Sequence, residues 1–320
     1  MTEFHFDLHG LVRGRVRGPE WLIGPARREL GFFASAEPPE LDLDIQVIPG
    51  SLKLVGHPFS WDGHHLGAQW RVRVKSESPI GLEVEANHLC RFIIFKWIIE
   101  PAIRVAAQKN GAIMAHAAAI SDGRNGLLVA GPGGAGKTTW VLSWLNREKP
   151  YLSDDFSLYY KEKLKAYPTL MRLSGNNLLV NHPINGLSGG NKAEIWLRTI
   201  IRRLTLGRLK IYFKSAPQQS IKNLIISDDV SLAGAIWLAD QKTEAGKLPR
   251  RITPEEMADR MAAVDESEAH GFGAGWLPSD FWPEHRRMLT EALTGKPCLI
   301  VAGRSLPPDA GSLEQLMTRL

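Results

Sequence analysis

The sequence predicts an α/β protein with a β-rich N-terminal region, residues 1–87, and an α/β core, residues 88–320. Three observations support this fold class. Before about residue 88, apolar and polar residues alternate with period two, which is typical of strands with one buried face. Near Asn87 the apolar spacing changes to the helical period. Beyond Gly111, short apolar segments alternate with glycine-containing turns and an amphipathic helix.

Two segments of the N-terminal region show the alternation most clearly. They are LDLDIQVIP (Leu41–Pro49) and QWRVRVKSE (Gln69–Glu77), and proline and glycine separate them. GHPFSWDGHH contains His57, His64 and His65, but no carboxylate or cysteine stands at metal-site spacing beside them. We therefore predict a loop for this histidine-containing segment.

A helical segment is predicted from Asn87 to Gly111. Asn87 is a candidate N-cap residue and Gly111 a candidate terminator. Pro101 within the segment predicts a kink or a division into two helices, because proline lacks the backbone N–H that a helix interior requires.

Within the core, the sequence pattern predicts strands that alternate with helices. Strands are expected over 112–120, 126–131 and 151–160, and helices over 137–148, 194–204 and 254–264. The sequence SDD at 227–229 is typical of a helix N-cap, so VSLAGAIWLA (Val230–Ala239) is predicted to be helical.

Composition limits the classes of partner. No apolar run reaches the roughly 18 residues of a membrane span, and MTEFHFDLHG does not resemble a signal peptide. Cys90 and Cys298 lack a partner motif, which is typical of a reducing compartment. The net charge of +5 permits anionic ligands but does not by itself indicate nucleic acid. We expect a cytoplasmic protein without a membrane or nucleic-acid partner.

The segment GPGGAGKT (131–138) matches the nucleotide-binding pattern G-x-x-x-x-G-K-[ST] and lies between a predicted strand and a predicted helix. Its glycines allow backbone N–H groups to converge on phosphate oxygens at a helix N-terminus. Lys137 is predicted to reach the β- and γ-phosphates, and the Thr138 hydroxyl to hold Mg²⁺. The predicted ATP·Mg²⁺-binding residues are Gly131, Gly133, Gly134, Ala135, Gly136, Lys137, Thr138 and Thr139.

The segment YLSDDFSLYY (Tyr151–Tyr160) places two adjacent carboxylates in a predicted strand. Because successive side chains on a strand point to opposite faces, Asp154 and Asp155 would lie on opposite sides of it. We expect this strand to run beside the strand before Gly131, with one acid facing the γ-phosphate and the other supporting a loop or the metal. The alternative is a strand that ends in a polar turn.

Together these residues resemble HPr kinase/phosphorylase and its relatives. His116 precedes Gly131 by 15 residues, and Asp155 follows Thr138 by 17, which is the order and approximate spacing in that family. AYPTLMRLSG (Ala166–Gly175) resembles the family's following Tyr-Pro…Leu-Arg segment. The resemblance covers about residues 88–175 and includes the shorter kinases of that group found in peptide-natural-product clusters.

The resemblance implies an HPr-kinase-like P-loop core in which Asp155 is the general base and His116 assists phosphoryl transfer. Lys137 and Thr138 keep their nucleotide and Mg²⁺ roles, and Asp154 supports the site as a second metal ligand. The chain departs from the family at 171–175, where it lacks an acidic residue for Mg²⁺. Arg304 is a weak candidate for the family's catalytic arginine. Both departures argue against the reverse phosphorylase reaction more than against the kinase reaction.

The predicted function is therefore transfer of the γ-phosphate of ATP to a serine or threonine hydroxyl of a peptide or small protein. We expect the N-terminal region, residues 1–87, to contribute to docking of this acceptor. The basic segment 197–214, with Arg202 and Arg203, could dock an acidic acceptor, although a solvated basic face is the simpler interpretation. Two alternatives stay open: a small-molecule kinase, and a nucleotide-binding switch that transfers no phosphate. His116 could also be a core histidine. The sequence leaves the oligomeric state open.

Overall fold

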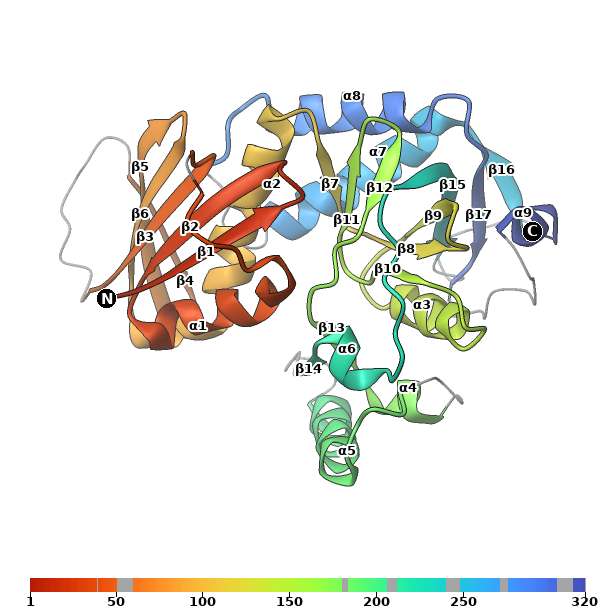
Figure 1. The fold of residues 1–320 in the computed structure, drawn as a ribbon, viewed down its shortest axis with the longest axis horizontal. Coiled ribbons are helices and arrows are strands. Elements are labelled where there is room, and N and C mark those ends of the chain that lie inside the picture. The colour runs from red at the N-terminus through yellow and green to blue at the C-terminus, as the bar shows by residue number, and fades with distance from the viewer. Residues whose placement is uncertain are drawn as a thin grey trace. The chain divides into compact units, whose positions relative to one another are not determined.

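The structure is a computed structural model that describes residues 1–38, 40–50, 60–179, 184–205, 212–239, 248–270, 276–303 and 313–319. It is a mixed α/β fold, as predicted, and it divides into two compact units (Figure 1). Unit 1 comprises Met1–Met114 and Asp265–His285, and unit 2 comprises Ala115–Val264 and Arg286–Leu320. The boundary between the two units lies within β7 (Ile113–Ala115). The change of hydrophobic period, from which we placed a boundary after residue 87, lies about 26 residues earlier in the chain.

Unit 1 contains a mixed sheet with strand order β1-β2-β3-β6-β5-β4. Its strands are β1 (Thr2–Leu8), β2 (Val12–Gly18), β3 (Leu43–Pro49), β4 (Ser60–His65), β5 (Ala68–Glu77) and β6 (Ile80–Ala86). The period-two segments 41–49 and 69–77 thus form strands, as predicted. The loop prediction for the histidine segment is wrong at His64 and His65, which lie in β4 and pair with β5; His57 lies outside the described residues.

The helical elements of unit 1 pack on this sheet, and this explains why the unit continues beyond residue 88. They are α1 (Glu20–Glu29), η1 (Gly31–Phe33), η2 (His88–Phe92), η3 (Phe95–Ile99) and α2 (Glu100–Lys109). Asn87 caps η2 by accepting a hydrogen bond from the Leu89 N–H, as predicted. Pro101 lies in the first turn of α2, so the segment is divided and not merely kinked.

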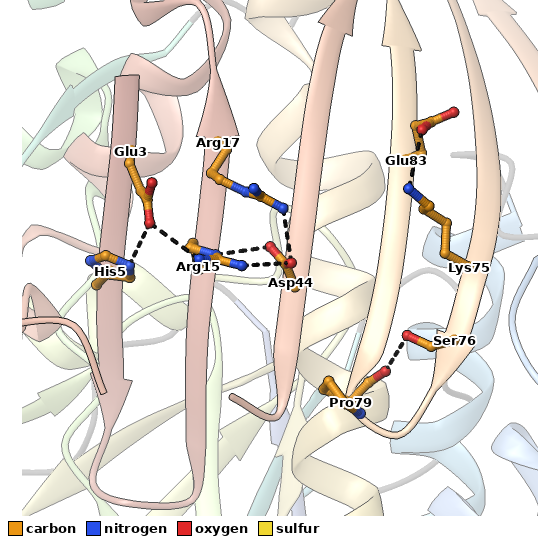
Figure 2. Close-up of polar contacts among 9 residues, drawn as sticks. All are labelled: Glu3, His5, Arg15, Arg17, Asp44, Lys75, Ser76, Pro79 and Glu83. Atoms are coloured by element: carbon orange, nitrogen blue, oxygen red, sulfur yellow. Dashed lines mark hydrogen bonds and ion pairs between the residues drawn. The ribbon is translucent and has the colours of Figure 1, made fainter. Parts of the chain in front are cut away.

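The outward face of the same sheet carries a chain of charged side chains across three neighbouring strands (Figure 2). Glu3 on β1 contacts His5 at 2.8 Å and Arg15 on β2 at 3.5 Å. Asp44 on β3 accepts from Arg15 at 2.9 Å and from Arg17 at 3.0 Å. These alternating charges satisfy one another across the ladder, so this face of the sheet is a polar surface opposite the apolar core.

A buried ionic triad in unit 1 joins residues from three helices. Asp265 of α7 (Pro254–His270) accepts from Arg104 of α2 at 2.8 Å and contacts His285 of α8 (Phe281–Leu293) at 2.7 Å. All three residues are buried, and the Arg104 guanidinium lies 5.3 Å from the Trp282 ring centroid. Burial lowers the pKa of His285 even though Asp265 opposes the shift.

Unit 2 is built around a second mixed sheet, in which the strands after β7 follow the order β10-β8-β9-β15-β12-β11. β15 pairs in parallel with β9 on one side and with β17 on the other, and β16 pairs with β17. The strands are β8 (Ala117–Ser121), β9 (Asn125–Ala130), β10 (Tyr151–Ser153), β11 (Ser157–Tyr160), β12 (Lys163–Lys165), β15 (Val230–Ala239), β16 (Arg250–Ile252) and β17 (Cys298–Ala302).

Helix α3 (Lys137–Leu145) begins directly after the glycine-rich loop, and Trp140 and Trp144 join the apolar cluster of this unit. A two-stranded ribbon, β13 (Met171–Leu173) and β14 (Phe213–Ser215), and its neighbouring helices extend from the sheet at the lower end of Figure 1. The remaining helices are α4 (Gly175–Leu179), α5 (Gly189–Leu204), α6 (Pro217–Ser220) and α9 (Leu313–Arg319).

The helices predicted over 137–148, 194–204 and 254–264 are present, but the prediction for 230–239 is wrong. Val230–Ala239 is β15, a strand inside the sheet of unit 2. A short apolar run fits a doubly covered strand as well as a buried helix, and only the pairing partners distinguish them. Among the described residues, no helix is long and apolar enough to span a bilayer.

We expect Asp265→Asn to destabilise unit 1 by about 3 kcal/mol or more, because the substitution leaves the Arg104 charge buried without its counter-ion. Urea denaturation followed by circular dichroism measures the effect. Glu291→Gln is the control, since it removes only the exposed pair with Arg287. Equal unfolding midpoints for the two variants would contradict a stabilising role for the triad.

Candidate active site

The glycine-rich loop 131–136 connects β9 to α3, which confirms the predicted strand–loop–helix arrangement. Gly131 has φ +152°, and a Cβ there would lie 2.7 Å from the Leu238 carbonyl oxygen at the end of β15. Gly136 precedes the first residue of α3 with φ +114°. Side chains at these two positions would be strained, so the loop needs glycine to turn tightly into the helix N-terminus.

The two polar side chains at the start of α3 face different partners. Lys137 is buried, and its Nζ donates to the Gly131 carbonyl oxygen at 2.7 Å, which folds the side chain back across the loop. The Thr138 hydroxyl hydrogen-bonds to the Asp154 carboxylate. Of the other predicted nucleotide-binding residues, Gly133 and Gly134 are exposed, Ala135 is buried and Thr139 is half-buried.

The two aspartates do not lie on a strand, and this part of the prediction is wrong. β10 ends at Ser153 and β11 begins at Ser157, so Asp154 and Asp155 occupy a bend between them. The Ser153 and Ser157 hydroxyls are 2.8 Å apart, and Ser157 donates to the Ala117 carbonyl oxygen at 2.7 Å. The two serines therefore join the ends of the bend, and the carboxylates are not held on opposite faces of a strand.

We had also predicted that the strand before the bend pairs with the strand before the glycine-rich loop, and this is wrong. β10 pairs with β8, and β8 lies between β10 and β9. The predicted strand over 112–120 is in turn interrupted at His116, which separates β7 from β8. The bend nevertheless reaches the glycine-rich loop through Thr138 and Asp154.

Asp154 is a buried carboxylate in an unfavourable setting. Burial is the main cause that raises its pKa from 3.8 to about 6, and the neighbouring charge of Asp155 raises it further. The Thr138 hydrogen bond and the charges of Arg172 and Lys137 oppose the shift. Within the described part of the chain, Asp154 Oδ1 has no hydrogen-bond partner. A buried carboxylate oxygen without a partner, next to a threonine hydroxyl, is a donor set that suits a divalent cation such as Mg²⁺.

Asp155 lies between two basic side chains. Arg172 of β13 contacts its Oδ2 at 2.8 Å, and His116 Nε2 lies 3.8 Å from its Oδ1. The His116 ring packs edge-on against Phe156 at 5.0 Å between centroids, so His116 is both a buried side chain and part of the site. The Asp155 side chain is 18% exposed to solvent, so an incoming group can reach it.

Arg172 is a site residue for which no role was predicted from the sequence. It lies in the Tyr-Pro…Leu-Arg segment that we had identified, at the place where an acidic Mg²⁺ ligand was looked for and not found. A basic residue in that segment was the available signal. The alternative arginine candidate, Arg304, lies outside the described residues.

The structure thus brings together Lys137, Thr138, Asp154, Asp155 and His116, all predicted from sequence, and adds Arg172. Gly303, at the end of β17, approaches the same loop: a Cβ on it would lie 3.2 Å from the Ala135 carbonyl oxygen. Cationic, hydroxyl and carboxylate groups therefore converge at one end of β8, β9 and β10. This arrangement can hold an anion at the helix N-terminus and accept a proton nearby.

Comparison of the chain with known proteins identifies no family: no protein-family model matches it, and no curated protein matches it significantly.

The raised pKa of Asp154 predicts a pH-dependent cost in stability. Between its ordinary pKa of 3.8 and about 6, the folded chain binds more protons at this carboxyl than the unfolded chain does. Stability contributed by this group is therefore lost as pH rises through that window. Urea denaturation in EDTA should show Asp154→Asn gaining about 1–3 kcal/mol relative to wild type between pH 4 and pH 7. A difference that is the same at both pH values would contradict the assignment.

Proposed function

We propose that this chain is an ATP-dependent kinase with an HPr-kinase-like P-loop core, and that it phosphorylates a serine or threonine hydroxyl of a peptide or small protein. The observation that carries the proposal is the difference in environment between two adjacent carboxylates. Asp154 is buried and hydrogen-bonded to Thr138, whereas Asp155 is partly exposed between Arg172 and His116. In this proposal Asp154 would hold the metal, and Asp155 would accept the proton of the acceptor hydroxyl.

The donor half of the proposed site is the glycine-rich loop with the start of α3. Backbone N–H groups of residues 133–138 would bind phosphate oxygens, and Lys137 would leave its Gly131 carbonyl partner to contact the β- and γ-phosphates. Thr138 and Asp154 would hold Mg²⁺, for which the unpartnered Oδ1 of Asp154 provides a ligand. Held by these two residues, Mg²⁺ would supply positive charge that offsets the negative charge of the phosphates.

In the acceptor half, Asp155 would take the proton from the attacking hydroxyl. The hydroxyl oxygen forms a new bond to the γ-phosphorus while the bond to the β–γ bridging oxygen breaks, and ADP leaves with that electron pair. Arg172 fixes the orientation of the Asp155 carboxylate through the 2.8 Å contact. His116 lies on the other side of the carboxylate and adds a second orienting contact.

The sheet of unit 2 is mixed, and this supports an HPr-kinase-like core over a fully parallel nucleotide-binding sheet. β9, β15 and β17 are parallel to one another, while β8 and β12 run antiparallel to their neighbours. The bend at Asp154 and Asp155 follows α3 after one short connection and strand β10. A cytoplasmic location is part of the proposal and rests on the two unpaired cysteines.

Lys137→Ala should abolish most binding of ATP·Mg²⁺, because Lys137 is the only charged residue in the sequence segment 131–138. Isothermal titration calorimetry of the full chain measures this directly. Lys222→Ala removes an exposed lysine elsewhere in unit 2 and serves as the control, with unchanged affinity expected. Equal affinity for ATP·Mg²⁺ in wild type and Lys137→Ala would contradict nucleotide binding at this loop.

Asp155→Asn should leave ATP affinity within a few-fold but slow phosphoryl transfer by about 10²-fold or more, the scale of losing a general base. The assay is transfer of labelled phosphate from ATP to the serine peptide that wild type modifies fastest in a peptide array. Asp259→Asn, an exposed aspartate on α7, is the control. Full transfer by Asp155→Asn would exclude Asp155 as the base, and nucleotide binding without transfer to any acceptor would favour the switch alternative.

A further inference from the structure

The β13–β14 ribbon has one apolar face and one charged face. Met171 and Leu173 of β13 and Phe213 of β14 are buried in the apolar cluster of unit 2. Arg172 and Lys214 lie directly opposite each other in the ribbon register, so their side chains share the other face. Lys214 is exposed to solvent. The ribbon therefore presents a pair of cations on the side away from its apolar contacts.

The charged face of the ribbon lies at the candidate active site. Arg172 Nη2 contacts Asp155 Oδ2 at 2.8 Å, so this face reaches the carboxylate that we propose as the general base. Side chains that oppose each other on neighbouring strands have their Cβ atoms about 5 Å apart. The flexible four-carbon side chain of Lys214 can therefore place its ammonium group beside the Arg172 guanidinium.

Two positive charges on one face of a ribbon favour the binding of an anion there. Like charges directly opposite each other on neighbouring strands repel, which destabilises the pair Arg172 and Lys214. Asp155 contacts Arg172 through one carboxylate oxygen, and its other oxygen faces His116 at 3.8 Å. A further negative charge beside Lys214 would reduce the repulsion between the two strands without displacing Asp155 from either contact.

The distance between the base and Lys214 limits where such an anion can be on the acceptor. The acceptor hydroxyl has to approach Asp155 within hydrogen-bonding distance. Neighbouring strands lie about 4.8 Å apart, and successive residues of an extended peptide advance by about 3.3 Å. A carboxylate one or two residues from the acceptor hydroxyl can therefore reach Lys214 while the hydroxyl is at Asp155.

We propose that Lys214 determines acceptor specificity, and that it binds a glutamate or aspartate of the acceptor within two residues of the phosphorylated serine or threonine. Arg172 keeps its contact with Asp155 and adds positive charge to the same face. This inference rests on the proposed kinase function and adds the class of acceptor to it, namely a peptide with a carboxylate close to its hydroxyl.

The test uses the full chain and three fluorescein-labelled synthetic peptides that differ only in the residues beside one serine, which are glutamate, glutamine or lysine. Fluorescence anisotropy without nucleotide should show that wild type binds the glutamate peptide about tenfold more tightly than the glutamine peptide. Lys214→Gln should remove this preference, and Lys214→Glu should reverse it in favour of the lysine peptide. Lys192→Gln, the same change at an exposed lysine of α5, is the control and should keep the preference of wild type.

Kinetics of phosphoryl transfer separate recognition from chemistry. With ATP·Mg²⁺ and the glutamate peptide, Lys214→Gln should raise the KM of the peptide by about threefold or more and leave kcat within about twofold, because Lys214 would contact the acceptor equally in the ground state and the transition state. The affinity for ATP·Mg²⁺, measured by isothermal titration calorimetry, should not change.

Three results would overturn this inference. They are equal affinity of wild type for the glutamate and glutamine peptides, an unchanged preference in Lys214→Gln, and a loss of ATP·Mg²⁺ affinity in Lys214→Gln, which would assign the cation to the nucleotide phosphates. Binding that depends on both glutamate and Lys214, without phosphoryl transfer, would contradict the kinase proposal alone. Transfer to serine without a preference for the glutamate peptide would contradict the role of Lys214 alone.

Discussion

Two carboxylates next to each other in a buried bend repel one another and lose hydration, so the surrounding chain has to supply compensating groups. The local structure of unit 2 can be read as that compensation. Thr138 supplies a hydroxyl to Asp154, Arg172 supplies a cation to Asp155, and the paired hydroxyls of Ser153 and Ser157 join the ends of the bend. The compensation is incomplete, since the pKa of Asp154 remains raised to about 6. An uncompensated buried carboxylate is typical of a site that is completed by a ligand.

The sheet determines which elements can meet at this bend. β15 pairs with β9 and β17 in parallel, so the ends of these strands lie at one edge, where Gly131 and Gly303 approach the ends of their neighbours closely. β8 lies between β9 and β10 and brings His116, the residue before it, to the same edge. The order of the strands therefore brings His116, the glycine-rich loop and the bend together, although they are far apart in sequence.

Sequence reasoning identified local features correctly and missed those that depend on pairing. The glycine-rich loop, the helix after it, the cap at Asn87 and the period-two strands are encoded within short segments. The bend at Asp154 depends on the contact of Ser157 with Ala117, 40 residues away. Strand β15 could not be distinguished from a helix without its partners, and the role of Arg172 depends on the fold of the β13–β14 ribbon. Whether the paired acids bind metal and accept a proton stays a prediction.

The ribbon gives the site a property that a P-loop alone lacks. Arg172 is held both by its strand pairing with β14 and by its contact with Asp155, so displacement of the ribbon would disturb the orientation of the carboxylate. β14 is joined to α5 through Tyr212, whose carbonyl and ring contact Arg198 and Arg202. The two arginines share a helix face with the buried residues Ile195 and Thr199, so α5 and the ribbon are joined on the packed side of the helix. The position of Asp155 therefore depends, through Arg172 and the ribbon, on contacts that reach as far as α5.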